Sequence, residues 1–307
     1  MNPLVSIVIP TYKRSQFISD CIESILNQDY SPLEIIVVDD NGKGTAFQVE
    51  TEKNLSHYVN NKLIRYIPHD VNKNGSAARN TGFKASKGDY VVFLDDDDTP
   101  LPNMVSLQVS RLSSLPDEFG AVYCNSIIKY HIRFFKFVRT IRTKSQKEGN
   151  LCKAVLTGKC RFNTSTILFR RSTIEILNGF DETFRRHQDY ELLVRFFTIF
   201  KIGCTYEPLI QYDLTKDVTP RMDCKFDYDI KLHFFEQRAK LLKEMGIYEE
   251  VAHSLWQESA VRAYLAGNME YYKIFRDKCH ETQRDSIEDI LRLGSFKILK
   301  RVKQLFC

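Results

Sequence analysis

Four consecutive aspartates at residues 95–98 directly follow the apolar run YVVFL at residues 90–94. Carboxylates this close together repel one another, and the repulsion grows as water is excluded from the site. A folded protein therefore has two reasons to carry such a run. It is either a solvated turn or an acidic site that holds something positive, and the rest of the chain has to distinguish the two.

Polar segments also follow the other apolar runs of the first hundred residues. Apolar runs at 4–9, 34–38, 63–67 and 90–94 predict strands, and helical patterns at 17–26 and 76–86 lie between them. Such alternation predicts an α/β fold, with a mostly parallel sheet covered by helices on both faces. The segments PTYKR, DDNG, HDVNKNGSAARN and DDDD follow the four strands. Because parallel strands bind ligands outside their carboxyl ends, we expect these segments to form one site.

The bulk composition is that of a soluble globular protein. The chain has 307 residues, 43% of them hydrophobic and 27% charged, which is enough for one large core or two domains. The net charge of +5 is too small to indicate a nucleic-acid partner, and none is predicted. No run approaches the ~20 apolar residues of a membrane-spanning helix. Eight scattered cysteines without a C-x-x-C pair predict reduced thiols and a cytoplasmic location.

Five sequence elements occur in a characteristic order: VSIVIPTYKR, IIVVDD, NGSAARNTG, YVVFLDDDD and GFDETFRRHQDYEL. In this order, over roughly residues 4–215, the chain resembles the family 2 glycosyltransferases. The resemblance implies the GT-A (nucleotide-diphospho-sugar transferase) fold. It also implies transfer of a sugar, with inversion, from a nucleotide diphosphate donor such as UDP to an acceptor hydroxyl. The acceptor would be a saccharide or a lipid-linked sugar, as in the synthesis of a cell-surface polysaccharide or glycolipid.

The aspartate run matches the D-x-D motif of this family. The resemblance implies that Asp95 lies near the ribose of the donor and that Asp97 holds a divalent metal on the diphosphate. A diphosphate needs a bridging cation to approach carboxylates, and hard oxygen ligands favour Mn²⁺ or Mg²⁺. Asp96 is grouped with the nucleotide-binding residues, although its role and that of Asp98 stay open. A solvated turn is the alternative for the run.

The resemblance implies further nucleotide-binding residues, namely Pro10, Thr11, Tyr12, Arg14, Asp40, Gly75 and Arg79. Tyr12 could cover the base and Arg14 could face phosphate. Asp40 would accept a hydrogen bond from a uracil ring. The alternatives are a strand-ending turn at residues 10–14, an Asp-Asn-Gly turn at Asp40 and a surface position for Arg79.

The last element contains the expected catalytic base. Inverting transfer needs a group that takes the proton of the acceptor, and the resemblance places Asp189 there. Gln188 replaces the glutamate that usually precedes this aspartate. The alternative is that Asp189 caps a helix, and Glu191 is either an acceptor contact or an exposed helix acid. No histidine occurs between His187 and His233, so water and phosphate oxygens would complete the shell of the metal.

The chain is predicted to contain a catalytic domain at residues 1–220 and a helical region at 221–307. Within the first, residues 1–100 form the nucleotide-binding half and 101–220 the acceptor half. The basic stretch 129–147 faces either an anionic partner or solvent. The segment 286–306 combines an apolar stripe with lysine and arginine, so it could lie on the inner face of the membrane as a peripheral contact. Packing on protein is the alternative.

Two other functions are compatible with parts of this pattern. A nucleotidyltransferase also uses acids and a metal on an α/β sheet, but it would need a glycine-rich phosphate loop near the first strand, and PTYKRS has no glycine. A catalytically silent nucleotide-sugar or membrane-surface binding protein is the second alternative. The presence of both Asp97 and Asp189 argues against it.

Overall fold

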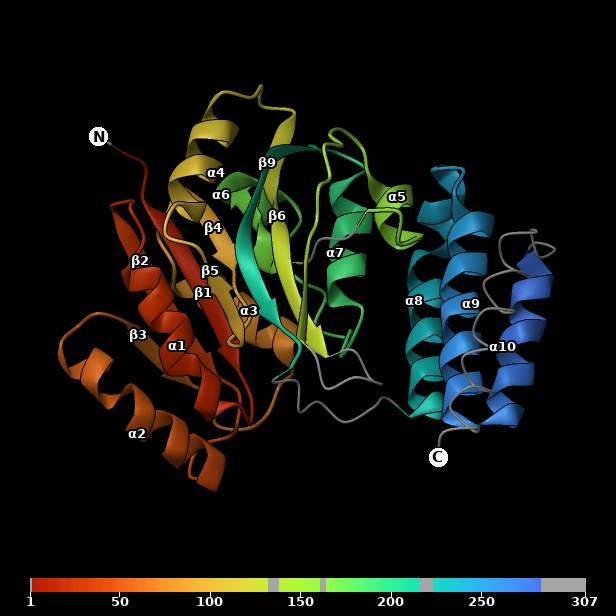
Figure 1. Cartoon of the computed structure of the whole chain (residues 1–307), viewed down its shortest axis with the longest axis horizontal. Helices are drawn as coiled ribbons and strands as arrows, with labels where there is room; N and C mark the ends of the chain where they lie inside the picture. Colours follow the sequence, from red (N-terminus) through yellow and green to blue (C-terminus); the bar gives the residue numbers. More distant parts are fainter. Residues whose placement is uncertain (1, 132–137, 161–163, 216–222, 283–307) are drawn as a thin grey trace. The chain divides into compact units, whose positions relative to one another are not determined.

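The computed structural model describes residues 2–131, 138–160, 164–215 and 223–282. The chain forms two compact units, one made of residues 1–151 with 161–218 and the other of residues 152–160 with the segment from 219 onward (Figure 1). The segment 286–306, for which a membrane contact is predicted, lies outside the described residues, as does the 132–137 part of the basic stretch.

The first unit begins with four parallel strands in the order β3-β2-β1-β4. They are β1 (Val5–Thr11), β2 (Leu33–Asp39), β3 (Arg65–Pro68) and β4 (Tyr90–Phe93). Each starts and ends within two residues of its prediction. The register pairs Thr11 with Asp39 and Asp39 with Pro68, so the carboxyl ends of these three strands are level. The polar segments that follow the strands therefore start at one edge of the sheet.

The rest of the sheet is mixed. Next to β4 lie β8 (Ile167–Arg170), β6 (Phe119–His131), β9 (Lys201–Asp213) and β5 (Asp98–Pro100), and β7 (Val138–Arg142) pairs with β6. Only β6 and β9 are parallel here, among the described residues; the other pairs are antiparallel. The α/β fold is thus confirmed, but the sheet is mixed rather than mostly parallel, because parallel pairs occur only among the first four strands and between β6 and β9 in the described part of the chain.

Helices cover both faces of this sheet. On one face, the buried stripes of α1 (Ser15–Leu26), α2 (Ala46–Asn60) and α4 (Met104–Ser113) form a core with Val5, Ile7 and Ile9 of β1. On the other face α3 (Gly75–Ala85) packs on β1 and β2. The residues of β1 alternate between the two faces, as a strand requires. Two further helices, α6 (Arg171–Ile176) and α7 (Gln188–Phe196), and the short 3₁₀ turn Thr164–Thr166 complete the unit.

The second unit is helical, as predicted. It contains α5 (Cys152–Leu156), α8 (Cys224–Glu244), α9 (Tyr248–Ala266) and α10 (Met269–Thr282), and the three long helices pack side by side (Figure 1). Trp256 lies at its centre, with ring contacts to Tyr228, Phe235 and Phe275. In the described part of the chain no helix is both long and apolar enough to span a bilayer, and all seven cysteines are free thiols.

The contact between α3 and β1 depends on a glycine of the NGSAARNTG element. A Cβ on Gly82 would lie 2.3 Å from Val8 Cγ1 and 3.2 Å from Val38 Cγ2. We expect Gly82→Ala to destabilise the fold by about 1–3 kcal/mol through overpacking, although alanine is the better helix former. Urea unfolding measures this, with Lys84→Ala on the exposed side of the same helix as control, expected within about 0.5 kcal/mol of wild type. A Gly82→Ala protein as stable as wild type would contradict this packing.

Candidate active site

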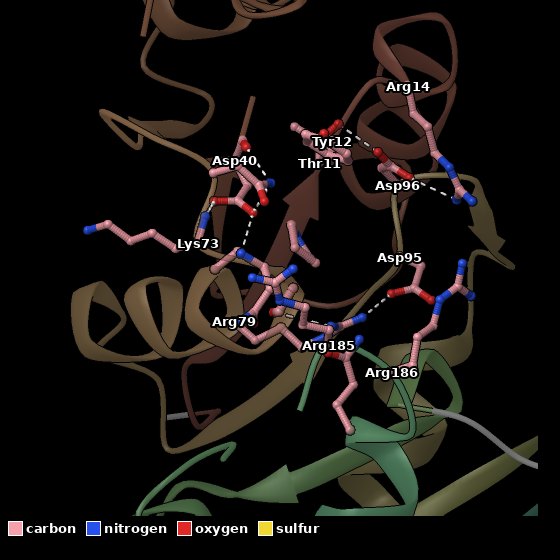
Figure 2. A pocket seen from close by; sticks show the side chains of 16 residues that line it. Thr11, Tyr12, Arg14, Asp40, Lys73, Arg79, Asp95, Asp96, Arg185 and Arg186 are labelled. Atoms are coloured by element: carbon pink, nitrogen blue, oxygen red, sulfur yellow. Dashed lines mark hydrogen bonds and ion pairs between the residues drawn. The ribbon is translucent and has the colours of Figure 1, made fainter. Parts of the chain in front are cut away.

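A cavity of about 470 Å³ lies where the four parallel strands end (Figure 2). Its size is in the range of small-molecule sites. The residues that line it are Pro10, Thr11, Tyr12, Arg14, Asp40, Asn72, Lys73, Asn74, Gly75, Ala78, Arg79, Asp95, Asp96, Arg185, Arg186 and Gln188. All nine residues predicted to bind the nucleotide are among them. Asp97 and Asp189 are not lining residues, but each neighbours one in the sequence.

The four aspartates alternate between exposed and buried positions. The side chains of Asp95 and Asp97 are both 34% exposed, whereas Asp96 and Asp98 are buried, at 3% and 6%. Thr11 Oγ1 donates to Asp96 Oδ2 at 2.6 Å. Burial raises the pKa of Asp96 to about 7, and burial, together with the charge of Asp95, also raises the pKa of Asp98. The run is therefore not a turn of four solvated side chains, because two carboxylates are accessible and two are buried.

Each of the two exposed carboxylates faces an arginine. Arg14 Nη1 lies 2.5 Å from Asp97 Oδ2 and 3.5 Å from Asp96 Oδ1. Arg79 Nη2 lies 2.5 Å from Asp95 Oδ1, and Arg79 is only 4% exposed, which excludes the surface position considered for it. Arg14 lines the cavity while it holds Asp97, and its contact with a phosphate stays a prediction.

The acidic edge suits a divalent cation in its donor chemistry. Asp95 and Asp97 offer accessible carboxylate oxygens, and the buried Asp98 Oδ2 has no hydrogen-bond partner among the described residues. In the described ranges no group of three His, Cys, Asp or Glu side chains is arranged around a common point. The protein would thus supply few ligands to Mn²⁺ or Mg²⁺, and phosphate and water oxygens would supply the others, as these hard cations accept.

Asp40 organises the loop that follows β3. Its carboxylate accepts hydrogen bonds from Asn72 Nδ2 at 2.8 Å, Lys73 N at 2.8 Å and Asn74 N at 2.9 Å. His69 Nδ1 lies 2.7 Å from the same carboxylate. Asp40 is therefore more than a turn residue, since it fixes the loop that forms one wall of the cavity. Its predicted contact with a uracil ring stays a prediction.

The start of α3 is built for close approach. Asn74, in the left-handed region with a φ of 83°, caps the helix by accepting from the backbone N–H groups of Ser76 and Ala77. A Cβ on Gly75 would lie 3.0 Å from Arg79 Nη1 and 3.2 Å from Gln188 Nε2. Gly75 thus leaves room for two cavity-lining side chains rather than adopting a special backbone conformation.

Asp189 lies in the first turn of α7 and does not cap it. The N-cap residue is His187, with a φ of 56°, so the capping alternative for Asp189 is wrong. Asp189 Oδ1 is buried and has no hydrogen-bond partner in the described part of the chain. Burial raises the pKa of Asp189 to about 6; the charge of Arg79 and the N–H of Thr164 act against this shift, and Asp95 adds to it. The carboxylate is therefore close to the Arg79–Asp95 pair and has an unused acceptor oxygen.

Glu191 is neither an exposed acid nor part of the cavity. It is fully buried and forms an ion pair with Arg195 through both oxygens, one of them at 2.7 Å from Nη2. Arg195 also donates to the carbonyl groups of Leu177 and Gly179. This network holds α7 against the turn that precedes it, so Glu191 has a structural role.

Several lining residues were not singled out from the sequence. They are Asn72, Lys73 and Asn74 of the loop after β3, and Arg185 and Arg186 shortly before α7. The first group lay within a polar strand end that was noted as a whole. The two arginines had a recognisable signal, because they are adjacent and lie three and four residues before the predicted base.

Solved structures identify this fold as GT-A. Staphylococcus aureus TarS (residues 1–349) in complex with UDP superposes with a TM-score of 0.56, over 93% of each chain at 13% identity. The mannosyltransferase PcManGT from Pyrobaculum calidifontis, in complex with GDP-Man and Mn²⁺, also gives a TM-score of 0.56, at 17% identity over 99% of this chain and 88% of its own. At these identities the likeness concerns the fold alone.

Sequence comparison shows the family. Residues 6–177 match the profile of glycosyl transferase family 2. The amylovoran biosynthesis glycosyltransferase AmsB of Erwinia amylovora is 32% identical over 215 residues, which is 68% of this chain and 69% of AmsB. The uncharacterized glycosyltransferase RP339 of Rickettsia prowazekii is 31% identical, and the match spans 68% of this chain but only 64% of RP339. The chain belongs to glycosyl transferase family 2.

Proposed function

We propose that this protein transfers a sugar from a uridine diphosphate donor to an acceptor hydroxyl, with inversion and with the help of Mn²⁺ or Mg²⁺. The observation that carries this is the convergence of all nine predicted nucleotide-binding residues on one cavity at the strand ends. The catalytic residues lie within 1–220, which we assign as the catalytic domain. Support comes from the UDP and GDP-Man–Mn²⁺ complexes of proteins with this fold.

The acidic edge would hold the metal and the polar part of the donor. Asp97 would bind the cation, and Asp95, held by Arg79 at 2.5 Å, would face the ribose. When bound, the cation supplies charge neutralisation to the departing diphosphate. Tyr12, 43% exposed, offers an aromatic face to the base. Arg14 would exchange its contact with Asp97 for the phosphate–metal complex.

Asp189 would take the proton of the acceptor hydroxyl. Its raised pKa makes it a better base than a solvent-exposed aspartate and leaves it ionised at neutral pH. Because Oδ1 has no partner in the described part of the chain, a hydroxyl can donate to it without breaking a hydrogen bond. The side chain of Asp189 lies beside the cavity rather than in its wall. The hydrogen bond between a catalytic base and its substrate commonly shortens only when the substrate binds.

The pH dependence of transfer should report this base. With a pKa of about 6, Asp189 is ionised and active above pH 7, and protonation inactivates it as the pH falls through 6. We expect the rate at saturating donor and metal to fall about tenfold per pH unit below that value. Initial rates between pH 4.5 and 8.5, with stability followed in parallel, measure this. A rate that stays flat down to pH 4.5 in folded protein would rule Asp189 out.

The acceptor is proposed to be a saccharide or a lipid-linked sugar, as in cell-surface polysaccharide or glycolipid synthesis. The name of AmsB, an amylovoran biosynthesis enzyme, supports this class.

Peripheral contact with the membrane through residues 286–306 is a separate proposal. Co-sedimentation of the full chain and of a variant ending at Asp285 with anionic liposomes at low salt tests it, since electrostatic attraction is then strongest. Equal binding of the two would refute it.

Calorimetry with UDP, GDP and ADP in the presence of Mn²⁺ tests the donor class. We expect UDP to bind about tenfold more tightly than GDP or ADP, because the proposed hydrogen bond to Asp40 requires a uracil ring. EDTA should remove most of the UDP affinity. Tighter binding of GDP than of UDP would indicate a guanosine diphosphate donor instead. If none of the three nucleotides binds, the proposed glycosyltransferase activity is refuted.

A further inference from the structure

Two arginines of the cavity wall have no charged partner among the residues that the structure describes. Arg185 and Arg186 are exposed and precede α7, on the opposite side of the cavity from Thr11, Tyr12 and Arg14 (Figure 2). Within the described residues neither forms an ion pair or a side-chain hydrogen bond, whereas Arg14 and Arg79 are both bound to carboxylates. Two adjacent unpaired guanidinium groups facing one cavity repel each other, unless an anion binds between or beside them.

The segment that carries these arginines is held firmly to α3. Three polar side chains of the α3 region donate hydrogen bonds to this segment. Asn74 Nδ2 donates to the carbonyl of Glu182 and Asn80 Nδ2 to the carbonyl of Phe180, both at 2.9 Å. Ser76 Oγ lies 2.9 Å from the carbonyl of Phe184 and 3.0 Å from Gln188 Oε1. Phe180 N returns a bond to Asn80 Oδ1 at 2.8 Å. Most of these are made by buried side chains. The two arginines therefore stand on a fixed wall, which a specific anion site requires.

The donor alone does not account for their charge. The cavity is lined by five basic residues and three acidic ones (Arg14, Lys73, Arg79, Arg185 and Arg186 against Asp40, Asp95 and Asp96). The exposed acids are already balanced by Arg14 and Arg79. A diphosphate that arrives with a divalent cation is itself nearly neutralised. The charges of Arg185 and Arg186 thus remain for a second anionic group.

The position of the arginines places this second group on the acceptor side. Arg186 and Arg185 precede Asp189 by three and four residues, a chain distance of at most about 10–14 Å. The hydroxyl that reacts must lie next to the base. A group held by these arginines would therefore belong to a molecule that also reaches the base, which is the acceptor.

We propose that Arg185 and Arg186 form an anion subsite that selects an acceptor carrying a phosphate or carboxylate group near the hydroxyl that reacts. The inference rests on the proposed function, because Asp189 defines the acceptor side. Paired guanidinium groups bind either anion with charge-assisted, geometrically specific hydrogen bonds. An anionic sugar on the donor has the same chemistry, so the experiment must separate the two sources.

The test uses full-length protein saturated with UDP and Mn²⁺, titrated with glucose 6-phosphate, glucuronate and glucose. We expect the two anionic probes to bind at least tenfold more tightly than glucose. In Arg185→Ala/Arg186→Ala their affinity should fall about ten- to a hundredfold, since charged hydrogen bonds are lost. The affinity for UDP with Mn²⁺ should change by less than about threefold. The charge-matched control is Lys84→Ala/Lys87→Ala, which removes two exposed lysines outside the cavity.

Three results would overturn the inference. One is equal binding of glucose and the anionic probes to wild type. A second is a double variant that loses UDP affinity tenfold or more, which would assign the arginines to the donor diphosphate. The third is a preference for UDP-glucuronate over UDP-glucose that disappears in the double variant, which would place the anion on the donor sugar. Failure of wild type to bind UDP would instead refute the proposed function. The anionic probes, titrated without UDP, would still show whether the two arginines bind an anion.

Discussion

Asp189→Asn is expected to lower the rate of sugar transfer by about a hundred- to ten-thousandfold, the usual contribution of a general base. The amide cannot take the proton of the acceptor, whereas its size matches that of the carboxylate. Because Asp189 does not cap α7, and its Oδ1 has no hydrogen-bond partner among the described residues, the substitution breaks no contact at that oxygen. Removing a buried charge of raised pKa should leave stability unchanged or slightly higher.

Transfer is measured by release of UDP in the presence of acceptor, with calorimetry of UDP and Mn²⁺ on the same samples. The control is Asp117→Asn, an exposed acid in the turn after α4, which should behave as wild type. An Asp189→Asn protein that keeps more than a tenth of the transfer rate would show that another group is the base. Glu191 would not be that group, because it is buried in its ion pair with Arg195.

Asp97→Ala is expected to abolish the dependence of UDP binding on Mn²⁺. The variant removes one of the two accessible carboxylates of the acidic edge, together with its contact to Arg14 at 2.5 Å. Loss of a charged ligand to the cation should weaken binding of UDP with Mn²⁺ by more than about tenfold, since a charged hydrogen bond or ligand contributes at least that much. In EDTA the variant should bind UDP at least as well as wild type, because Arg14 then loses its shorter contact with Asp97 and keeps the 3.5 Å contact with Asp96, so it can turn toward phosphate more easily.

Calorimetry of wild type and variant, each with Mn²⁺ and with EDTA, gives the four affinities needed. Asp117→Ala again serves as the control for loss of an acidic residue. If Mn²⁺ still strengthens UDP binding to Asp97→Ala as much as in wild type, the metal is held elsewhere. The buried Asp98, whose Oδ2 has no hydrogen-bond partner in the described ranges, would then be the residue to replace.

The part of the fold that could be predicted is the part with strong periodicity. Four apolar runs in the first hundred residues predict the four parallel strands. The polar segments after these runs predict the position of the site, because parallel strands end at the same edge of a sheet. The antiparallel half was harder. Its strands include β5 with three residues, and β7, whose residues are all exposed, so neither carries a hydrophobic pattern.

The contacts within the site could not be predicted in the same way. The sequence has two aspartates at the end of β2 and four shortly after β4, but only burial shows that Asp96 and Asp98 point inward. Likewise, Asp40 binds a loop more than thirty residues away, and Glu191 looks like any helix acid until its partner Arg195 is seen in a buried setting. Local patterns reveal where polar residues gather, whereas the partner of each depends on tertiary packing.

The products formed from a nucleotide-sugar show directly whether the protein is a glycosyltransferase. Full-length protein is incubated with Mn²⁺ and a panel of UDP-sugars, and the nucleotide products are separated and identified. A glycosyltransferase breaks the bond between the sugar and the diphosphate, so we expect release of UDP, strongly reduced in Asp189→Asn and in EDTA. Release of UMP with a sugar 1-phosphate, or of no nucleotide from any donor, would contradict it.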